Sequence, residues 1–134
     1  EDNQKEIALA KELITAYYEN LTSVIVGNEV LLRDDLSPDA LMEHIRDFKG
    51  FVYSIAKTKK EANEKYIKDE VAKVKGKKAQ AAKEKSLREE FAKVKEHSVL
   101  VTTAEIWNMW LLYPQLSYEV DIINIHIPKY RFNI

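Results

Sequence analysis

Residues 57–96 read KTKKEANEKYIKDEVAKVKGKKAQAAKEKSLREEFAKVKE, and this stretch decides the fold. It is rich in lysine, glutamate and alanine, which favour helix, and Gly76 interrupts it near the middle. We predict two antiparallel helices that reverse near Gly76 and pack as a coiled-coil arm. Folding the stretch back at Gly76 places Tyr66 beside Leu87 and Ala62 beside Phe91, so that large side chains meet small ones. The alternative is one unbroken helix through Gly76 that pairs with another molecule.

The segment before the arm is helical in pattern as well. Ser37 and Pro38 form a helix-start signal, because serine caps free amides and proline fits the first helical position. A seam of apolar residues, spaced alternately by four and three, then runs into the arm with one lysine interruption: Leu41, Ile45, Phe48, Val52, Ile55, Lys59, Ala62 and Tyr66. An earlier amphipathic helix is predicted over 4–26, ended by Gly27. The apolar segment 30–32 between these two helices fits either a brief strand or a loop.

The segment after the arm changes in character. Residues 99–101 predict a short strand, and Thr102-Thr103-Ala104-Glu105 is a capping-box pattern that predicts the start of a short apolar helix. Two further strands are expected, one over 118–127 and one carrying Tyr130, Phe132 and Ile134. The predicted fold class is therefore α+β and mainly helical. A long antiparallel helical hairpin would stand on a small head that includes two or three C-terminal antiparallel strands.

We predict a single domain over 1–134, in which 1–56 and 97–134 form the head and 57–96 form the projecting arm. The charge is divided between these parts: residues 1–56 carry eleven acidic and five basic side chains, whereas 57–97 carry eight acidic and fourteen basic ones. The net charge is −1 and there is no cysteine, so the chain forms no disulfide and no thiolate metal site. No apolar run is long enough to span a bilayer. The compartment stays open, and because the chain begins at Glu1 we expect a segment or a processed product.

Signatures of catalysis are missing from the sequence. The three glycines are too far apart for a phosphate-binding loop, and no serine lies in a nucleophile-elbow motif. His44, His97 and His126 are scattered, and Glu43, His44 and Asp47 do not have the spacing of a helical zinc motif. We therefore predict no catalytic residue, no metal, no cofactor and no enzymatic activity.

A role in protein–protein interaction, as a structural subunit or adaptor, requires the fewest assumptions. The partner would be another protein, which includes a second copy of this chain. Tryptophan, methionine and other aromatic residues are enriched at interface cores, and a terminal strand can pair with a neighbouring chain. The predicted partner-binding residues are Trp107, Met109, Trp110, Tyr130 and Phe132.

Lysines at the end of the arm support an alternative function, a nucleic-acid-associated factor. Those that would bind an anion are Lys73, Lys75, Lys77, Lys78, Lys83 and Lys85. Acidic residues are interleaved along the arm, however, and aromatic residues for base stacking are scarce near its end. Protein binding is therefore the favoured reading of the sequence.

Overall fold

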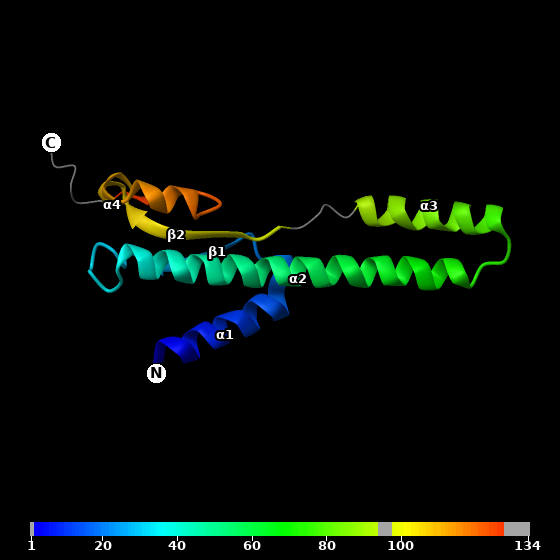
Figure 1. Cartoon of the computed structure of the whole chain (residues 1–134), viewed down its shortest axis with the longest axis horizontal. Coiled ribbons are helices and arrows are strands. Elements are labelled where there is room, and N and C mark those ends of the chain that lie inside the picture. Colours follow the sequence, from blue (N-terminus) through cyan, green and yellow to red (C-terminus); the bar gives the residue numbers. More distant parts are fainter. Residues whose placement is uncertain (1, 94–97, 128–134) are drawn as a thin grey trace. The chain divides into compact units, whose positions relative to one another are not determined.

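The computed structural model describes residues 2–93 and 98–127, which fall into two compact units (Figure 1). Unit 1 comprises Glu1–Val52 and Val99–Ile134, and unit 2 comprises Tyr53–Ser98. Helix α2, Pro38–Ala72, begins in unit 1 and ends in unit 2. The division of the chain into one domain with a head and a projecting arm stays a prediction.

The chain is α+β, and the sheet in unit 1 is parallel. Strands β1 (Ser23–Asn28), β2 (Leu100–Ile106) and β3 (Asn124–His126) pair in the order β1-β2-β3, and both pairings are parallel. The prediction of antiparallel strands is therefore wrong. Parallel neighbours require a long crossover that returns the chain to its starting edge. Helix α4 (Trp107–Leu112) and the 3-10 helix η2 (Pro114–Tyr118) supply that crossover between β2 and β3.

The first helix is shorter than predicted. Helix α1 spans Asp2–Tyr17, a 3-10 turn η1 follows at Tyr18–Asn20, and the chain then enters β1 rather than remaining helical to residue 26. Three consecutive β-branched residues, Val24, Ile25 and Val26, favour a strand over a helix. Gly27 has the left-handed backbone conformation that was predicted, with φ of +77°. This conformation forms a bulge in β1, however, and does not end a helix.

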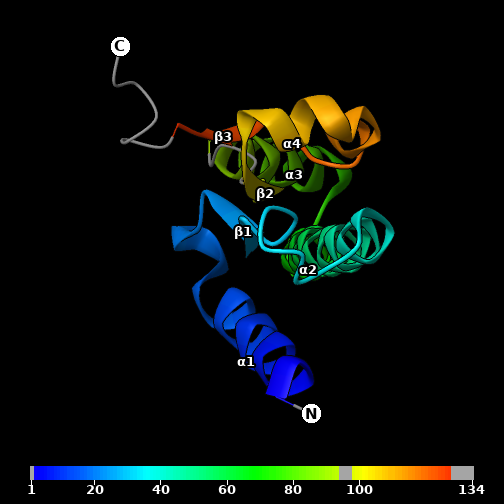
Figure 2. The same ribbon diagram turned by 90° about the vertical axis from the view of Figure 1, so that its left-hand side faces the viewer.

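The predicted capping box at 102–105 is also wrong, because these residues lie within β2. Thr102 donates its hydroxyl to the carbonyl of Ile122, and Thr103 donates to the carbonyl of Gly27 at 3.4 Å. Both threonine side chains therefore bind neighbouring segments and do not cap a helix. In Figure 2, strands β1 and β2 lie between α1 and α4, and β2 is almost wholly buried.

Helix α2 begins as predicted and packs its apolar seam into unit 1. The amide of Ala40 donates to the side chain of Ser37 at 3.2 Å, which confirms Ser37 as the cap. Leu41, Ile45, Phe48 and Val52 are all buried. Residues 30–32 form a turn and not a strand, with Val30 and Leu31 buried against the core.

Gly27 is expected to tolerate no side chain. A Cβ at this position would lie 3.0 Å from Cγ2 of Val30, and the positive φ adds strain. We expect Gly27→Ala to lower the free energy of unfolding by about 1–3 kcal/mol, measured by urea denaturation with tryptophan fluorescence. Gly50→Ala is the control, because Gly50 is helical with open space around it. That control should raise stability by about 0.5–1 kcal/mol, and equal losses in both variants would contradict this account.

Unit 2 contains the C-terminal half of α2 and helix α3 (Lys77–Lys93), which run antiparallel. The chain reverses at Gly76, whose φ is +94°, so the predicted reversal is confirmed and the unbroken helix is wrong. The rings of Tyr66 and Phe91 meet edge to face with centroids 6.0 Å apart, and Arg88 binds Glu64 across the hairpin at 2.9 Å. Coiled-coil packing of this hairpin stays a prediction.

Candidate functional site

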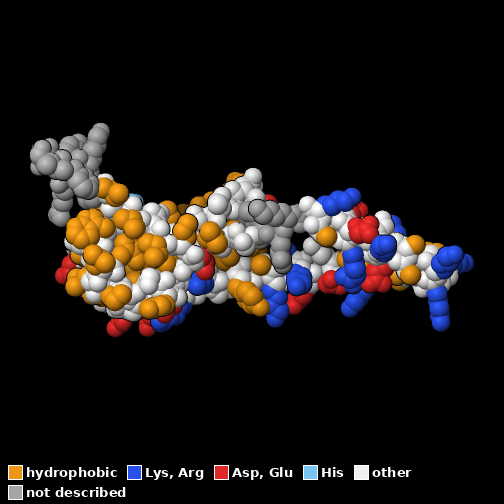
Figure 3. Space-filling model, turned by 90° about the horizontal axis from the view of Figure 1, so that it is seen from above, with side chains coloured by type: hydrophobic (Ala, Val, Ile, Leu, Met, Phe, Trp, Pro, Cys, Tyr) orange, Lys and Arg blue, Asp and Glu red, His pale blue; other side chains and the backbone are white. Residues whose placement is uncertain are grey.

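Helix α4 presents an apolar face to solvent. Trp107, Leu111 and Leu112 are 49%, 72% and 60% exposed, whereas Trp110 on the same helix is 7% exposed. Trp107 and Leu111 are four residues apart and therefore share one side of the helix. Figure 3 shows hydrophobic side chains gathered over α4, at the left end of the view.

Exposed apolar side chains also lie in and beside strand β3, which the Trp110–Asn124 hydrogen bond joins to α4. Ile125 lies in β3, Ile123 and Ile127 flank the strand, and the three alternate in sequence with Asn124 and His126, which are half-buried. Each of these isoleucines is about half exposed or more. We call the combined set the α4–β3 surface, and its members are Trp107, Leu111, Leu112, Tyr118, Ile122, Ile123, Ile125 and Ile127.

Partly buried hydrogen bonds hold the α4–β3 surface in place. The indole Nε1 of Trp110 donates to the carbonyl of Asn124 at 3.1 Å, which joins α4 to β3. The carboxylate of Asp121 accepts from the amide of Val101 at 2.8 Å, and the Asp121 amide donates back to the Val101 carbonyl at 2.9 Å. These bonds fix the segment between η2 and β3 along β2.

Ion pairs attach the same segment to α2. Arg46 binds the Glu119 carboxylate through both Nε, at 2.9 Å, and Nη2, at 2.5 Å, and this bidentate contact lowers the pKa of Glu119. Lys49 lies 3.2 Å from Asp121 and also donates to the carbonyl of Glu119 at 3.0 Å. The exposed apolar surface therefore rests on a segment that is bound on two sides.

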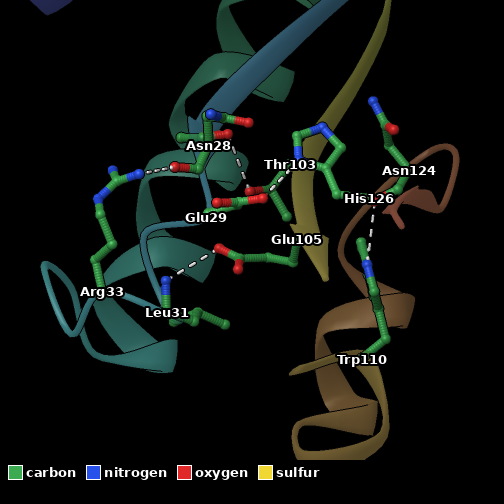
Figure 4. A network of polar contacts seen from close by, with 10 residues as sticks. Asn28, Glu29, Leu31, Arg33, Thr103, Glu105, Trp110, Asn124 and His126 are labelled. Atoms are coloured by element: carbon green, nitrogen blue, oxygen red, sulfur yellow. Dashed lines mark hydrogen bonds and ion pairs between the residues drawn. The ribbon is translucent and has the colours of Figure 1, made fainter. Parts of the chain in front are cut away.

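A polar cluster lies where the three parallel strands end (Figure 4). Nδ1 of His126 lies 3.1 Å from Oε1 of Glu29, which joins the end of β3 to the turn after β1. Arg33 donates to the carbonyl of Asn28 at 2.7 Å and so closes this turn. The carboxyl ends of parallel strands are where α/β sheets commonly bind ligands, so this edge is the natural place to look for chemistry.

Glu105 is the buried member of the polar cluster. Its side chain is fully buried, and Oε1 accepts from the amide of Leu31 at 3.0 Å, while Oε2 is buried without a hydrogen-bond partner among the residues that the structure describes. Burial raises the pKa of Glu105, the amides of Leu31, Leu32 and Val30 oppose that rise, and the charge of Glu29 adds to it. The residue anchors the turn after β1, a role that the capping-box reading missed.

The polar cluster does not assemble a recognised centre. Within 2–93 and 98–127, no group of three or more histidine, aspartate or glutamate side chains could hold a metal. His44 is half-buried on α2, and His97 lies outside the described residues. The Glu29–His126 pair and the Glu105–Leu31 bond join segments of unit 1, so their visible role is structural. The helices in the described part of the chain include none that is long and apolar enough to cross a membrane.

The predicted partner-binding residues are placed differently by the structure. Trp107 is exposed on α4, Met109 is half-buried and Trp110 is buried against the chain itself. Tyr130 and Phe132 lie outside the described residues. The sequence reading missed Leu111 and Leu112, whose exposure depends on which side of α4 packs on the sheet. The four-residue spacing of Trp107 and Leu111 was the available signal.

The predicted anion-binding lysines lie in the turn between α2 and α3 and in the N-terminal half of α3. Lys73 binds Glu70, and that contact lowers the pKa of the Glu70 carboxyl and raises the pKa of Lys73. The other five are Lys75, Lys77 and Lys78, which are exposed, Lys83, which is half-buried, and Lys85, which lies 4.0 Å from Glu89. The reversal of the chain therefore gathers these lysines in one part of unit 2, and Figure 3 shows basic side chains toward the right end of the view.

Comparison with protein-family models, curated proteins and solved structures finds no match to this chain.

Proposed function

We propose that this protein is a non-enzymatic structural subunit or adaptor that binds another protein chain, and that a second copy of itself is the first partner to test. The observation that carries the proposal is the exposure of Trp107, Leu111 and Leu112 on a helix whose remaining tryptophan is buried. Soluble monomers rarely expose large contiguous apolar patches, and such patches commonly mark interaction sites.

The build of the α4–β3 surface supports this function. Tryptophan and tyrosine are common interface anchors, because each offers a large rigid apolar body with one polar group. Trp107 and Tyr118 are exposed, and the segment that follows Tyr118 is fixed to β2 and α2 by the contacts of Asp121 and Glu119. A surface that is already ordered loses little conformational entropy when it binds.

The edge of the sheet gives a second means of association. Among the residues that the structure describes, strand β3 pairs with β2 on one side and is the last strand in the order β1-β2-β3. An extended segment of a partner can add to such an edge, with side-chain pockets providing specificity. In addition to the α4–β3 surface, the helical hairpin of unit 2 would contact the partner as a coiled-coil element of the assembly.

We expect the protein to be a dimer or larger in light scattering coupled to size exclusion, and expect Leu111→Ser with Leu112→Ser to shift it to the monomer mass. The double substitution removes two side chains that are 72% and 60% exposed, so it weakens the interface without opening the core. The matched control is Leu9→Ser with Leu13→Ser, which changes two leucines on α1 that are also exposed.

The control also separates the two exposed apolar stripes of unit 1. Leu9, Leu13 and Tyr17 share one side of α1, so they form the rival docking face. A monomer produced by the α1 variant but not by the α4 variant would place the interface on α1. A wild-type protein that is strictly monomeric at every concentration would reject self-association. The proposal would then require that the wild type binds a different protein and that Leu111→Ser with Leu112→Ser abolishes this binding.

A further inference from the structure

The turn of the helical hairpin concentrates positive charge. Between residues 73 and 85, which we call the hairpin tip, there are six lysines and one acidic residue, Glu84. Glu84 is already engaged, because its carboxylate binds Nε of Arg88 at 2.9 Å. Arg88 also binds Glu64 across the hairpin, so both Glu64 and Glu84 are directed toward Arg88, whereas Glu70 binds Lys73 at the edge of the tip.

Three exposed lysines of the hairpin tip have no partner among the described residues. The described part of the protein gives Lys75, Lys77 and Lys78 no ion pair and no side-chain hydrogen bond, and all three are exposed. By contrast, Lys73 at the edge of the tip is paired with Glu70. Along α2, Lys57 lies 3.9 Å from Glu61. Acidic residues alternate with lysines along this part of α2, as is usual on a solvated helix, but the sequence contains no acidic residue between Glu70 and Glu84. The alternation of charge therefore stops at the turn.

The placement of Lys77 and Lys78 is electrostatically unfavourable in the isolated chain. They are the first two residues of α3, whose first turn contains no acidic residue. A helix N-terminus carries a partial positive charge, so a cation placed there is destabilising where an anion would stabilise. The lysines of the tip and the start of α3 thus add to one positive potential, which an external anion would neutralise.

We propose that the hairpin tip binds the phosphate backbone of a double-stranded nucleic acid without reading its sequence. Lysine is a point charge suited to phosphate, and a duplex offers a regular array of phosphates to several lysines at once. The tip contains no aromatic residue, and the ring of Tyr66 is engaged with Phe91. Base stacking, which single-strand binding relies on, therefore has no side chain here. Contacts to phosphates fix position on a duplex but carry no sequence information.

The test is fluorescence anisotropy with a labelled random-sequence DNA duplex of about 20 base pairs, titrated at several salt concentrations. We expect the wild-type protein to bind at low salt, with log affinity falling by about 0.9 per phosphate contact for each tenfold rise in salt, or about 3 for three lysines. The variant Lys75→Gln, Lys77→Gln, Lys78→Gln should lose more than about tenfold in affinity at low salt and show a slope close to zero.

A control of equal charge separates the tip from net charge. The variant Lys57→Gln, Lys60→Gln, Lys65→Gln removes three positive charges from α2, outside the tip, and should bind almost as wild type does. A single substitution, Glu70→Gln, releases Lys73 from its partner and should tighten binding several-fold. Because it adds affinity, this variant tests the proposal even if the triple tip variant were to disturb the hairpin, which circular dichroism would show.

Three results would overturn the proposal. The first is absence of duplex binding at low salt, and the second is an equal loss in the tip and α2 variants, which would mean that net charge alone matters. The third is binding to vesicles of phosphatidylserine and phosphatidylcholine with none to the duplex, which would assign the tip to a lipid surface. None of these results bears on the α4–β3 surface, because the lysines of the tip belong to unit 2 and that surface belongs to unit 1.

Discussion

Replacing Trp110 with alanine is expected to lower the free energy of unfolding of unit 1 by about 3–5 kcal/mol, because a buried tryptophan leaves a large cavity. The side chain is 7% exposed, and its Nε1 donates to the carbonyl of Asn124 at 3.1 Å. The substitution therefore removes apolar packing and also the bond that joins α4 to β3. Urea denaturation followed by the fluorescence of the remaining Trp107 measures the effect.

The neighbouring tryptophan supplies the matched control. Trp107 is 49% exposed, so Trp107→Ala should change the free energy of unfolding by no more than about 1 kcal/mol. Trp110→Phe separates packing from hydrogen bonding, since it keeps an aromatic ring and loses the Nε1 donor, and should cost about 1–2 kcal/mol. If both alanine variants lost equal stability, the assignment of one tryptophan to the core and the other to the surface would be wrong.

The two tryptophans show how far sequence patterns reach. Helix α4 is apolar almost all round, so its composition predicts contact on several sides but not which tryptophan meets the chain's own sheet. That choice depends on how α4 leaves β2 at Ile106 and on the position of Asn124, eighteen residues farther along the chain. The tertiary packing of α4 therefore determines which tryptophan is exposed, and sequence periodicity does not predict it.

The helices were accessible from sequence because their signals are local. Ser37 and Pro38 mark the start of α2, and Gly76 marks the reversal into α3. The direction of the strands was not accessible, because parallel and antiparallel pairing depend on where the crossovers return the chain. The short strand β1 could not be recognised from sequence either. The apolar residues of β1 continue the helical spacing of α1, so the pattern fitted one helix as far as Gly27, which in the structure forms a bulge of β1.

The lysine cluster was visible in the sequence, but its pairing was not. Interleaved glutamates suggest a neutral surface along the hairpin. In the structure Glu64 and Glu84 both bind Arg88, which leaves the lysines of the turn without those carboxylates. The Arg88–Glu64 contact between α3 and α2 therefore keeps the Glu64 carboxylate away from the tip lysines. This contact forms only when the chain folds back at Gly76.

Glu105 is the buried group with the clearest consequence for pH dependence. It is fully buried on β2, and its Oε1 accepts from the amide of Leu31. Glu105→Leu should lower the free energy of unfolding by about 1–3 kcal/mol at mildly acidic pH, because the Leu31 amide would lose its acceptor inside the protein. Glu105→Gln should cost less, since the amide oxygen can still accept from Leu31.

The raised pKa of Glu105 fixes the sign of the pH effect. Its ordinary value is 4.5, and burial favours the protonated form in the folded state. The folded state therefore binds its proton more tightly than the unfolded state does. This contribution to stability is complete below pH 4.5 and is lost as pH rises from there through the folded-state pKa.

Glu105→Gln isolates this contribution, because the glutamine side chain resembles the protonated acid and does not titrate. Urea denaturation from about pH 4 to about pH 8, followed by tryptophan fluorescence, should show wild type losing stability relative to Glu105→Gln as pH rises. Ion pairs such as Arg46–Glu119 change with pH in both proteins and cancel in the difference. A difference that stays constant, or that favours wild type more at high pH, would mean that the turn amides of residues 30–32 outweigh burial. The carboxylate would then be the form that holds the turn after β1.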